Sequence, residues 1–159
     1  MKRYLILFLT LSTFLFAEAK HNHLAYDGVS SLIKSIDDKA IVLGNGQKDV
    51  YAFIDPMCRY SRKFIKTLSS NKSMLDKYRY HLFLYEIPRL HSQKVIYAIY
   101  QKKNRVQILL DVMLHDKHVV PLNNTPLVEE KRVVSDIAKV AKELDVFKRP
   151  YIIVSQESE

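Results

Sequence analysis

The sequence is poor in cysteine, because its 159 residues include only Cys58. A single cysteine cannot form a disulfide within the chain, so a disulfide-stabilised scaffold is excluded. Metal-binding patterns are also scarce. His115 and His118 have the spacing of one helix face, but no third ligand is apparent, and zinc sites use about three or four ligands. We therefore predict neither a metal site nor a cofactor.

Long apolar runs are missing as well. Residues 4–16 form the most apolar stretch, and they fall short of the about 20 residues that span a bilayer. Lys2 and Arg3 precede this stretch and Ala17-Glu18-Ala19 follows it, which is the pattern of a secretory signal peptide with its cleavage site. We predict that residues 1–19 are such a signal, with an uncleaved membrane anchor as the alternative.

Acidic residues are outnumbered, with 17 aspartates and glutamates against 25 lysines and arginines and a formal charge of +8. The lysines are spread along the chain and do not cluster. Together with the predicted export signal, this distribution argues against nucleic acid as a partner. A basic exported protein suits acidic protein partners or an anionic membrane surface.

The chain's cysteine follows a short segment typical of a buried strand. Residues 50–54 are apolar, β-branched or aromatic, and Asp55-Pro56 comes next. Pro56 fixes its own φ and disfavours the helical region for Asp55, so this pair predicts a turn. Phe64, Ile65 and Leu68 then form an apolar stripe with helical spacing. The pattern places Cys58 at the start of a helix.

A cysteine at that position has a chemical consequence. The unpaired N–H groups and the positive end of the helix dipole favour an anion, and Arg59, Arg62 and Lys63 act in the same direction. The thiolate is the nucleophilic form of cysteine, so Cys58 is a candidate reactive group. A buried, inert cysteine on the inner face of the helix is the alternative, and position alone leaves both open.

Two segments resemble parts of one known family. Residues 55–64, which begin Asp55-Pro56-Met57-Cys58, resemble the active-site segment of thioredoxin-fold proteins of the DsbC/DsbG disulfide-isomerase group. The pattern of that group is a strand, Asp-Pro-x-Cys-x-Tyr-Cys, and a basic and apolar helix. Residues 146–154 resemble the group's loop that carries a cis-proline before a core strand. The resemblance covers roughly residues 48–154 and implies an α/β, thioredoxin-like domain over residues 48–159, in a periplasmic protein.

The resemblance also implies roles for individual residues. Cys58 matches the nucleophile, and Ser61 stands where the group has its second cysteine, so it is a candidate hydrogen-bond donor to the thiolate. Pro150 matches the cis-proline that packs beside the cysteine and helps bind extended client backbone. The candidate client-binding residues are Arg149, Pro150, Tyr151, Arg59 and Tyr60.

Ser61 also marks a departure from the family, since the motif reads Cys-x-x-Ser. A dithiol enzyme cycles by letting its second thiol attack the mixed disulfide, and serine cannot do this. The expected chemistry is therefore monothiol exchange or isomerisation on exported client proteins that contain cysteines, with release by the client's own thiol, an upstream reductant or a small thiol. A redox-inactive thioredoxin-fold module that binds proteins is the alternative, and the sequence does not settle whether the chain is an enzyme.

The other expected elements fit around this domain. Residues 20–47 are predicted to form a short N-terminal segment with a helix over 29–36. Residues 40–43 and 48–54 read as strands joined through Gly44-Asn45-Gly46, a strong hairpin signal.

Downstream, residues 80–87 predict the next core strand. Apolar stripes predict helices over 93–100, 105–114 and 125–144, an all-helical insertion that the resemblance also implies. Residues 151–154 predict the strand after the cis-proline. The group's members continue with one more strand and a final helix, which this sequence is expected to lack.

Overall fold

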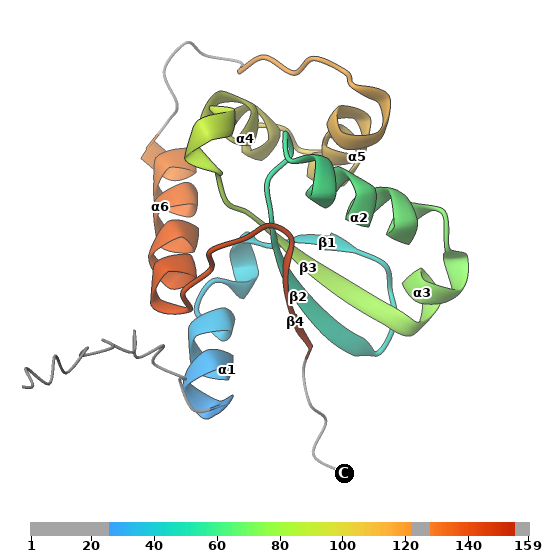
Figure 1. The fold of residues 1–159 in the computed structure, drawn as a ribbon, viewed down its shortest axis with the longest axis vertical. Coiled ribbons are helices and arrows are strands. Elements are labelled where there is room, and N and C mark those ends of the chain that lie inside the picture. The colour runs from blue at the N-terminus through green and yellow to red at the C-terminus, as the bar shows by residue number, and fades with distance from the viewer. Residues whose placement is uncertain (1–25, 122–127, 155–159) are drawn as a thin grey trace, which may run out of the picture.

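A computed structural model describes residues 26–121 and 128–154 and shows a mixed α/β architecture (Figure 1). Four strands form one sheet in the order β1-β3-β2-β4. Its strands are β1 (Ile41–Leu43), β2 (Lys48–Ile54), β3 (Tyr78–Leu84) and β4 (Tyr151–Val154). The helices are α1 (Tyr26–Lys34), η1 (Asp37–Lys39), α2 (Arg59–Ser69), α3 (Lys72–Lys77), η2 (Pro88–Leu90), α4 (Gln93–Tyr100), α5 (Arg105–His115) and α6 (Val128–Glu143).

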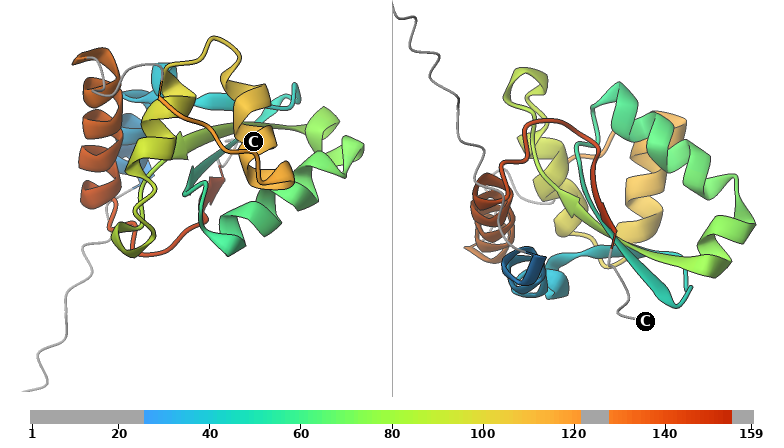
Figure 2. Two further views of the ribbon diagram at one scale, coloured as in Figure 1. Left: turned by 90° about the horizontal axis from the view of Figure 1, so that it is seen from above. Right: turned by 60° about the horizontal axis from the view of Figure 1, so that its bottom comes forward.

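The two central strands run parallel and carry the core. Val50 lies opposite Tyr80 in the β2–β3 ladder, while β1 and β4 run antiparallel to their neighbours. Helices α1 and α6 lie on one side of the sheet and α2 and α5 on the other (Figures 1 and 2). Because both faces are covered, the ends of β2 and β3 are apolar without alternation. Phe53 and Phe83 are fully buried and their rings lie 5.2 Å apart.

The predicted hairpin between the first two strands is wrong. Strand β1 pairs with β3, which lies between β1 and β2 in the sheet. The glycine-rich turn serves a close backbone approach instead: the N–H of Asn45 donates to the Leu75 carbonyl at 3.0 Å, and the N–H of Gly46 to the Tyr78 carbonyl at 3.3 Å. Gly44 has a φ of 87°, which a residue with a side chain rarely adopts.

The remaining elements lie close to their predicted positions. Helix α4 has its predicted bounds, α5 extends one residue further, and β4 has its predicted bounds. Strand β3 begins and ends earlier than predicted, and α1 begins and ends earlier too. Helices α4, α5 and α6 form the expected helical insertion between β3 and β4 (Figure 1). The predicted signal peptide and the predicted start of α6 lie outside the described residues.

An ionic cluster joins β2, β3 and η1. The Asp49 carboxylate accepts hydrogen bonds from Arg79 at 2.7 and 3.1 Å and lies 3.0 Å from Nε2 of the buried His81. The other ring nitrogen of His81 lies 2.6 Å from Asp37 Oδ1. The hydrogen bond from Arg79, helped by His81, lowers the pKa of Asp49 although partial burial opposes the shift.

Replacing Asp49 with asparagine is expected to lower the free energy of unfolding by about 1–2 kcal/mol near neutral pH, because charge-assisted hydrogen bonds are lost. The pKa of Asp49 in the folded protein is lower than in the unfolded chain. Its contribution is therefore present above the unfolded pKa of about 3.9 and is lost as the pH falls through the folded pKa. Urea unfolding of both proteins at about pH 7 and about pH 3 measures this difference.

Asp76→Asn is the matched control, because Asp76 pairs with Lys72 on an exposed helix surface, where ion pairs contribute little. The prediction would be contradicted if the wild type and Asp49→Asn differed in free energy of unfolding by the same amount at both pH values.

Candidate functional site

Cys58 lies where a tight turn passes into a helix. Its N–H donates to the Asp55 carbonyl at 3.0 Å, which closes the turn through Pro56, and its own carbonyl accepts from the Arg62 N–H at 2.9 Å. Cys58 has extended backbone geometry and caps the N-terminus of α2. The predicted placement at a helix start is confirmed. The thiol is free, and the residue is only 6% exposed.

The cis-proline loop lies against this cysteine. The Arg149–Pro150 peptide bond is cis, as the resemblance implied. The Cys58 thiol lies 3.7 Å from the Arg149 carbonyl oxygen and donates to it, across 91 residues of sequence. In the left view of Figure 2, the loop before β4 passes beside the N-terminal end of α2. The fold therefore brings together the two segments that carried the resemblance.

The Arg149 side chain holds this loop in place. Its guanidinium donates to the carbonyls of Glu86 at 2.8 Å, Tyr85 at 3.2 Å and Val146 at 3.3 Å. It also stacks on the Tyr85 ring at 3.8 Å from the centroid. These contacts join the cis-proline loop to the residues that follow β3 and direct the Arg149 carbonyl at Cys58. Its role in client binding stays a prediction, and so does that of Pro150.

Asp55 is a site residue that the sequence analysis treated only as part of a turn. It is fully buried. Its Oδ1 accepts from the Met57 N–H at 2.8 Å, and its Oδ2 accepts from the Ile87 N–H at 2.5 Å and the Ser92 hydroxyl at 2.7 Å. One carboxylate thus fixes the turn before Cys58 to the segment after β3 and to the start of α4. In the sequence, the Asp55-Pro56 pair was the only local signal of this role of Asp55.

Ser61 lies beneath the turn. It is fully buried, and its hydroxyl oxygen accepts from the Asp55 N–H at 3.2 Å. In the part of the chain that the structure describes, this bond, and not one to Cys58, is the hydrogen bond of the Ser61 hydroxyl. Donation to a Cys58 thiolate stays a prediction, while support of the turn is what the geometry displays.

Exposed aromatic and basic side chains lie in the two segments that meet at the buried thiol. Tyr60 is 58% exposed and the Arg59 guanidinium lies 4.8 Å from its ring centroid. Phe147 is 69% exposed, contacts the ring of Tyr151 edge-on and has the Lys148 ammonium 5.4 Å from its centroid. Arg59, Tyr60 and Tyr151 were predicted client-binding residues, whereas Phe147 and Lys148 were not singled out. Phe147 and Lys148 lie in the loop before β4, where no periodic sequence pattern indicates which side chains are exposed.

Comparison with known proteins assigns the fold. No family model matches the chain, and no curated protein matches its sequence. A periplasmic thioredoxin-like protein from Salmonella enterica serovar Typhimurium superposes with a TM-score of 0.64 at 12% identity, over 84% of this chain and 87% of that one. The fold is thioredoxin-like.

Two other known structures also superpose on this chain and support the thioredoxin-like fold. A disulfide interchange protein from Neisseria gonorrhoeae has a TM-score of 0.58 at 21% identity, over 73% of this chain and 79% of that one. Helicobacter pylori DsbG has a TM-score of 0.58 at 16% identity, over 80% of this chain and 60% of that one. At identities this low, the superpositions establish the thioredoxin-like fold alone. The subgroup and the activity have to be argued from the site.

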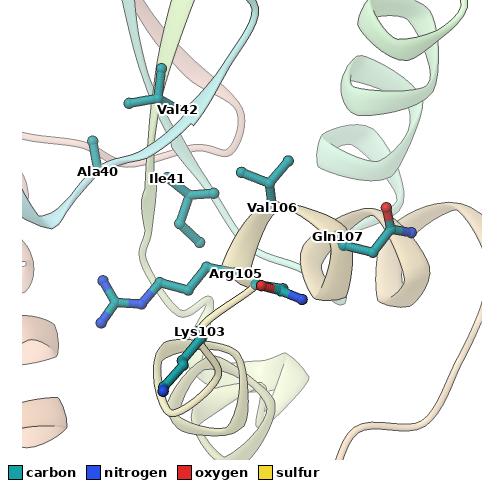
Figure 3. Close-up of a pocket in the computed structure, with 8 residues that line it drawn as sticks. Ala40, Ile41, Val42, Lys103, Arg105, Val106 and Gln107 are labelled. Carbon is teal, nitrogen blue, oxygen red and sulfur yellow. The ribbon is translucent and has the colours of Figure 1, made fainter.

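The described structure also holds a cavity away from the cysteine. A cavity of about 470 Å³ lies between β1 and the start of α5, lined by Ile41, Val42, Lys103, Arg105 and neighbours (Figure 3). Strand β1 is at the opposite edge of the sheet from β4, so this cavity is separate from the cysteine. Within residues 26–121 and 128–154, no group of three potential metal ligands occurs, and no helix is long and apolar enough to cross a membrane.

Proposed function

We propose that this thioredoxin-like protein performs monothiol thiol–disulfide exchange or isomerisation on exported client proteins through Cys58. One observation carries the proposal: Cys58 caps the N-terminus of α2 with its sulfur 3.7 Å from the carbonyl that precedes the cis-proline. A helix N-terminus stabilises a thiolate, and the adjoining loop offers backbone groups to an extended client. The names of two similar structures, a disulfide interchange protein and DsbG, support the same chemistry.

The exchange step balances without a second protein thiol. The Cys58 thiolate attacks one sulfur of a client disulfide, that S–S bond breaks, and the other client sulfur leaves as a thiolate. A different client thiolate then attacks the client sulfur bound to Cys58, forms a new client disulfide and releases the Cys58 thiolate. The client is isomerised with no net oxidation. When a small thiol or an upstream reductant attacks the Cys58 sulfur instead, the client leaves reduced and Cys58 is left in a mixed disulfide with the attacking thiol. A second thiol of the reductant then attacks the reductant's sulfur, forms the reductant's own disulfide and releases the Cys58 thiolate.

A second candidate function is favoured by the burial of the thiol. Cys58 is 6% exposed and its S–H is engaged by the Arg149 carbonyl, and exchange requires access to the sulfur. In a redox-inactive binding module, the cis-proline loop and the exposed aromatic residues would hold a client segment while the Cys58 sulfur stayed covered.

Trapping and turnover distinguish these two functions. The chain from residue 20 onward, and its Cys58→Ala variant, are incubated with a peptide held by a single disulfide to a small thiol. We expect a mixed disulfide, seen by intact mass, on the wild type and none on the variant. The wild type alone should then accelerate recovery of a scrambled disulfide protein. Absence of any adduct on the native protein, with peptide binding retained in both proteins, would establish the binding module instead.

We also propose that the protein acts in the periplasm. The signal-like segment over residues 1–19 and the periplasmic description of the Salmonella relative support this. Cell fractionation followed by measurement of the intact mass tests the proposal. A cleaved signal would give the mass of a chain that begins at Lys20.

A further inference from the structure

We propose that the surface around Cys58 selects client segments that carry acidic side chains close to their cysteine. We define the aromatic–basic rim as Arg59, Tyr60, Phe147 and Lys148. This inference rests on the proposed exchange function and concerns which disulfides the protein attacks. The partner is a polypeptide with carboxylates within about two residues of the disulfide.

The rim residues belong to the two segments that meet at the thiol. Arg59 and Tyr60 directly follow Cys58 at the start of α2. Phe147 and Lys148 directly precede Arg149, whose carbonyl contacts the Cys58 sulfur. Each pair stacks a cation over an exposed ring. The two exposed rings, each paired with a cation, lie in segments that meet at the thiol, so they are available to a client that reaches Cys58.

The charge of the rim is not neutralised. Among the residues that the structure describes, neither Arg59 nor Lys148 has a carboxylate within ion-pair distance, whereas the neighbouring Arg62 pairs with Asp116. Arg149 adds a third cation, whose guanidinium hydrogen bonds within the described residues go to neutral carbonyls. Within residues 26–121 and 128–154, the two segments that meet at the buried thiol therefore carry three cations that have no carboxylate partner.

A client segment with this chemistry fits both sides at once. Its carboxylates would meet Arg59 on one side of Cys58 and Lys148 on the other, while its apolar side chains would contact Tyr60 and Phe147. Complementary charge raises the association rate and excludes partners of the same sign. A segment with lysines beside its cysteine should be repelled by the same residues.

The test uses three peptides of equal length, each joined by one disulfide to the same small chromophoric thiol. They differ only in the two residues that flank the cysteine, which are glutamate, serine or lysine. Each rate of adduct formation on Cys58 is divided by the rate of the same peptide with a simple thiol, which corrects for intrinsic reactivity. We expect glutamate to exceed lysine by about tenfold at low ionic strength, with most of the difference lost in about 0.5 M salt.

Matched variants locate the effect. Arg59→Gln combined with Lys148→Gln should reduce the glutamate-to-lysine ratio to below about twofold. The control combines Lys131→Gln with Lys139→Gln, which removes the same charge from exposed positions on α6, on the other side of the sheet from α2 (Figure 1). The control should keep the wild-type ratio.

The outcomes separate this inference from the function on which it rests. Adducts that form at equal rates with all three peptides overturn the acidic-client inference and leave thiol exchange intact. Absence of adducts with every peptide overturns the exchange function itself. Equal rates together with binding to anionic phosphatidylglycerol vesicles that the rim variant loses would assign the rim to a membrane surface, which also overturns the inference.

Discussion

Replacing Asp55 with alanine is expected to lower the free energy of unfolding by about 2–4 kcal/mol, because buried hydrogen-bond donors lose their acceptor. The fully buried carboxylate accepts from Met57, Ile87 and Ser92, and alanine leaves all three donors unpaired. The same change should release the turn before Cys58, so the thiol should become more accessible. Urea unfolding measures the first effect and the alkylation rate of the native protein the second.

Asp55→Asn separates the hydrogen bonds from the volume of the side chain. Asparagine keeps the shape but replaces one oxygen with an NH₂ group, which cannot accept from the backbone N–H it would face. We therefore expect its stability to lie between those of the wild type and Asp55→Ala. Ser92→Ala, which removes one donor and leaves no donor unpaired, should cost less than either. An alanine variant within about 0.5 kcal/mol of wild type would show that these bonds contribute little.

Gly46→Ala is expected to destabilise the protein by about 3 kcal/mol or more, as overpacking does where the backbone cannot move. A Cβ at this position would lie 2.0 Å from the Lys77 carbonyl carbon and 2.2 Å from the Tyr78 nitrogen. Both atoms belong to the junction of α3 and β3, so relief of the overlap requires a shift of the strand that pairs with β2. Thermal and urea unfolding would measure the loss.

Asn45→Ala is the matched control for this prediction. Asn45 is the exposed neighbour of Gly46, and its contact with Leu75 uses the backbone N–H, which alanine retains. We expect a change within about 0.5 kcal/mol, as at other surface positions. If both variants unfolded at the same urea concentration, the close approach at Gly46 would not limit stability.

The local part of this fold could be predicted from the sequence. Helices α4 and α5 and strand β4 follow from apolar spacing within the segment itself, and the turn before Cys58 follows from Asp-Pro chemistry. The hairpin was predicted wrongly because Gly-Asn-Gly is a local signal, whereas the partner of β1 is decided by β3 over 30 residues later. A turn motif does not specify which strand pairs beside it.

The candidate site also combines features that have a local sequence signal with features that depend on distant segments. Cys58 could be placed from a local pattern and Pro150 from the resemblance to the DsbC/DsbG group, and their segments do meet. The partners of Asp55 are 32 and 37 residues downstream, at Ile87 and Ser92, and no spacing rule joins residues so far apart. The contacts of the Arg149 side chain with the carbonyls after β3 could not be predicted from the sequence either. They form only when β3 and β4 lie on either side of β2.

The position of β4 has a consequence for the order of events during synthesis. The Arg149 carbonyl that contacts the Cys58 sulfur belongs to the loop before β4 and is made 91 residues after the cysteine. Chains emerge from the N-terminus, and pairing between distant segments is slow. Cys58 therefore gains the cover of this carbonyl only after β4 and its loop have been made and have docked beside β2.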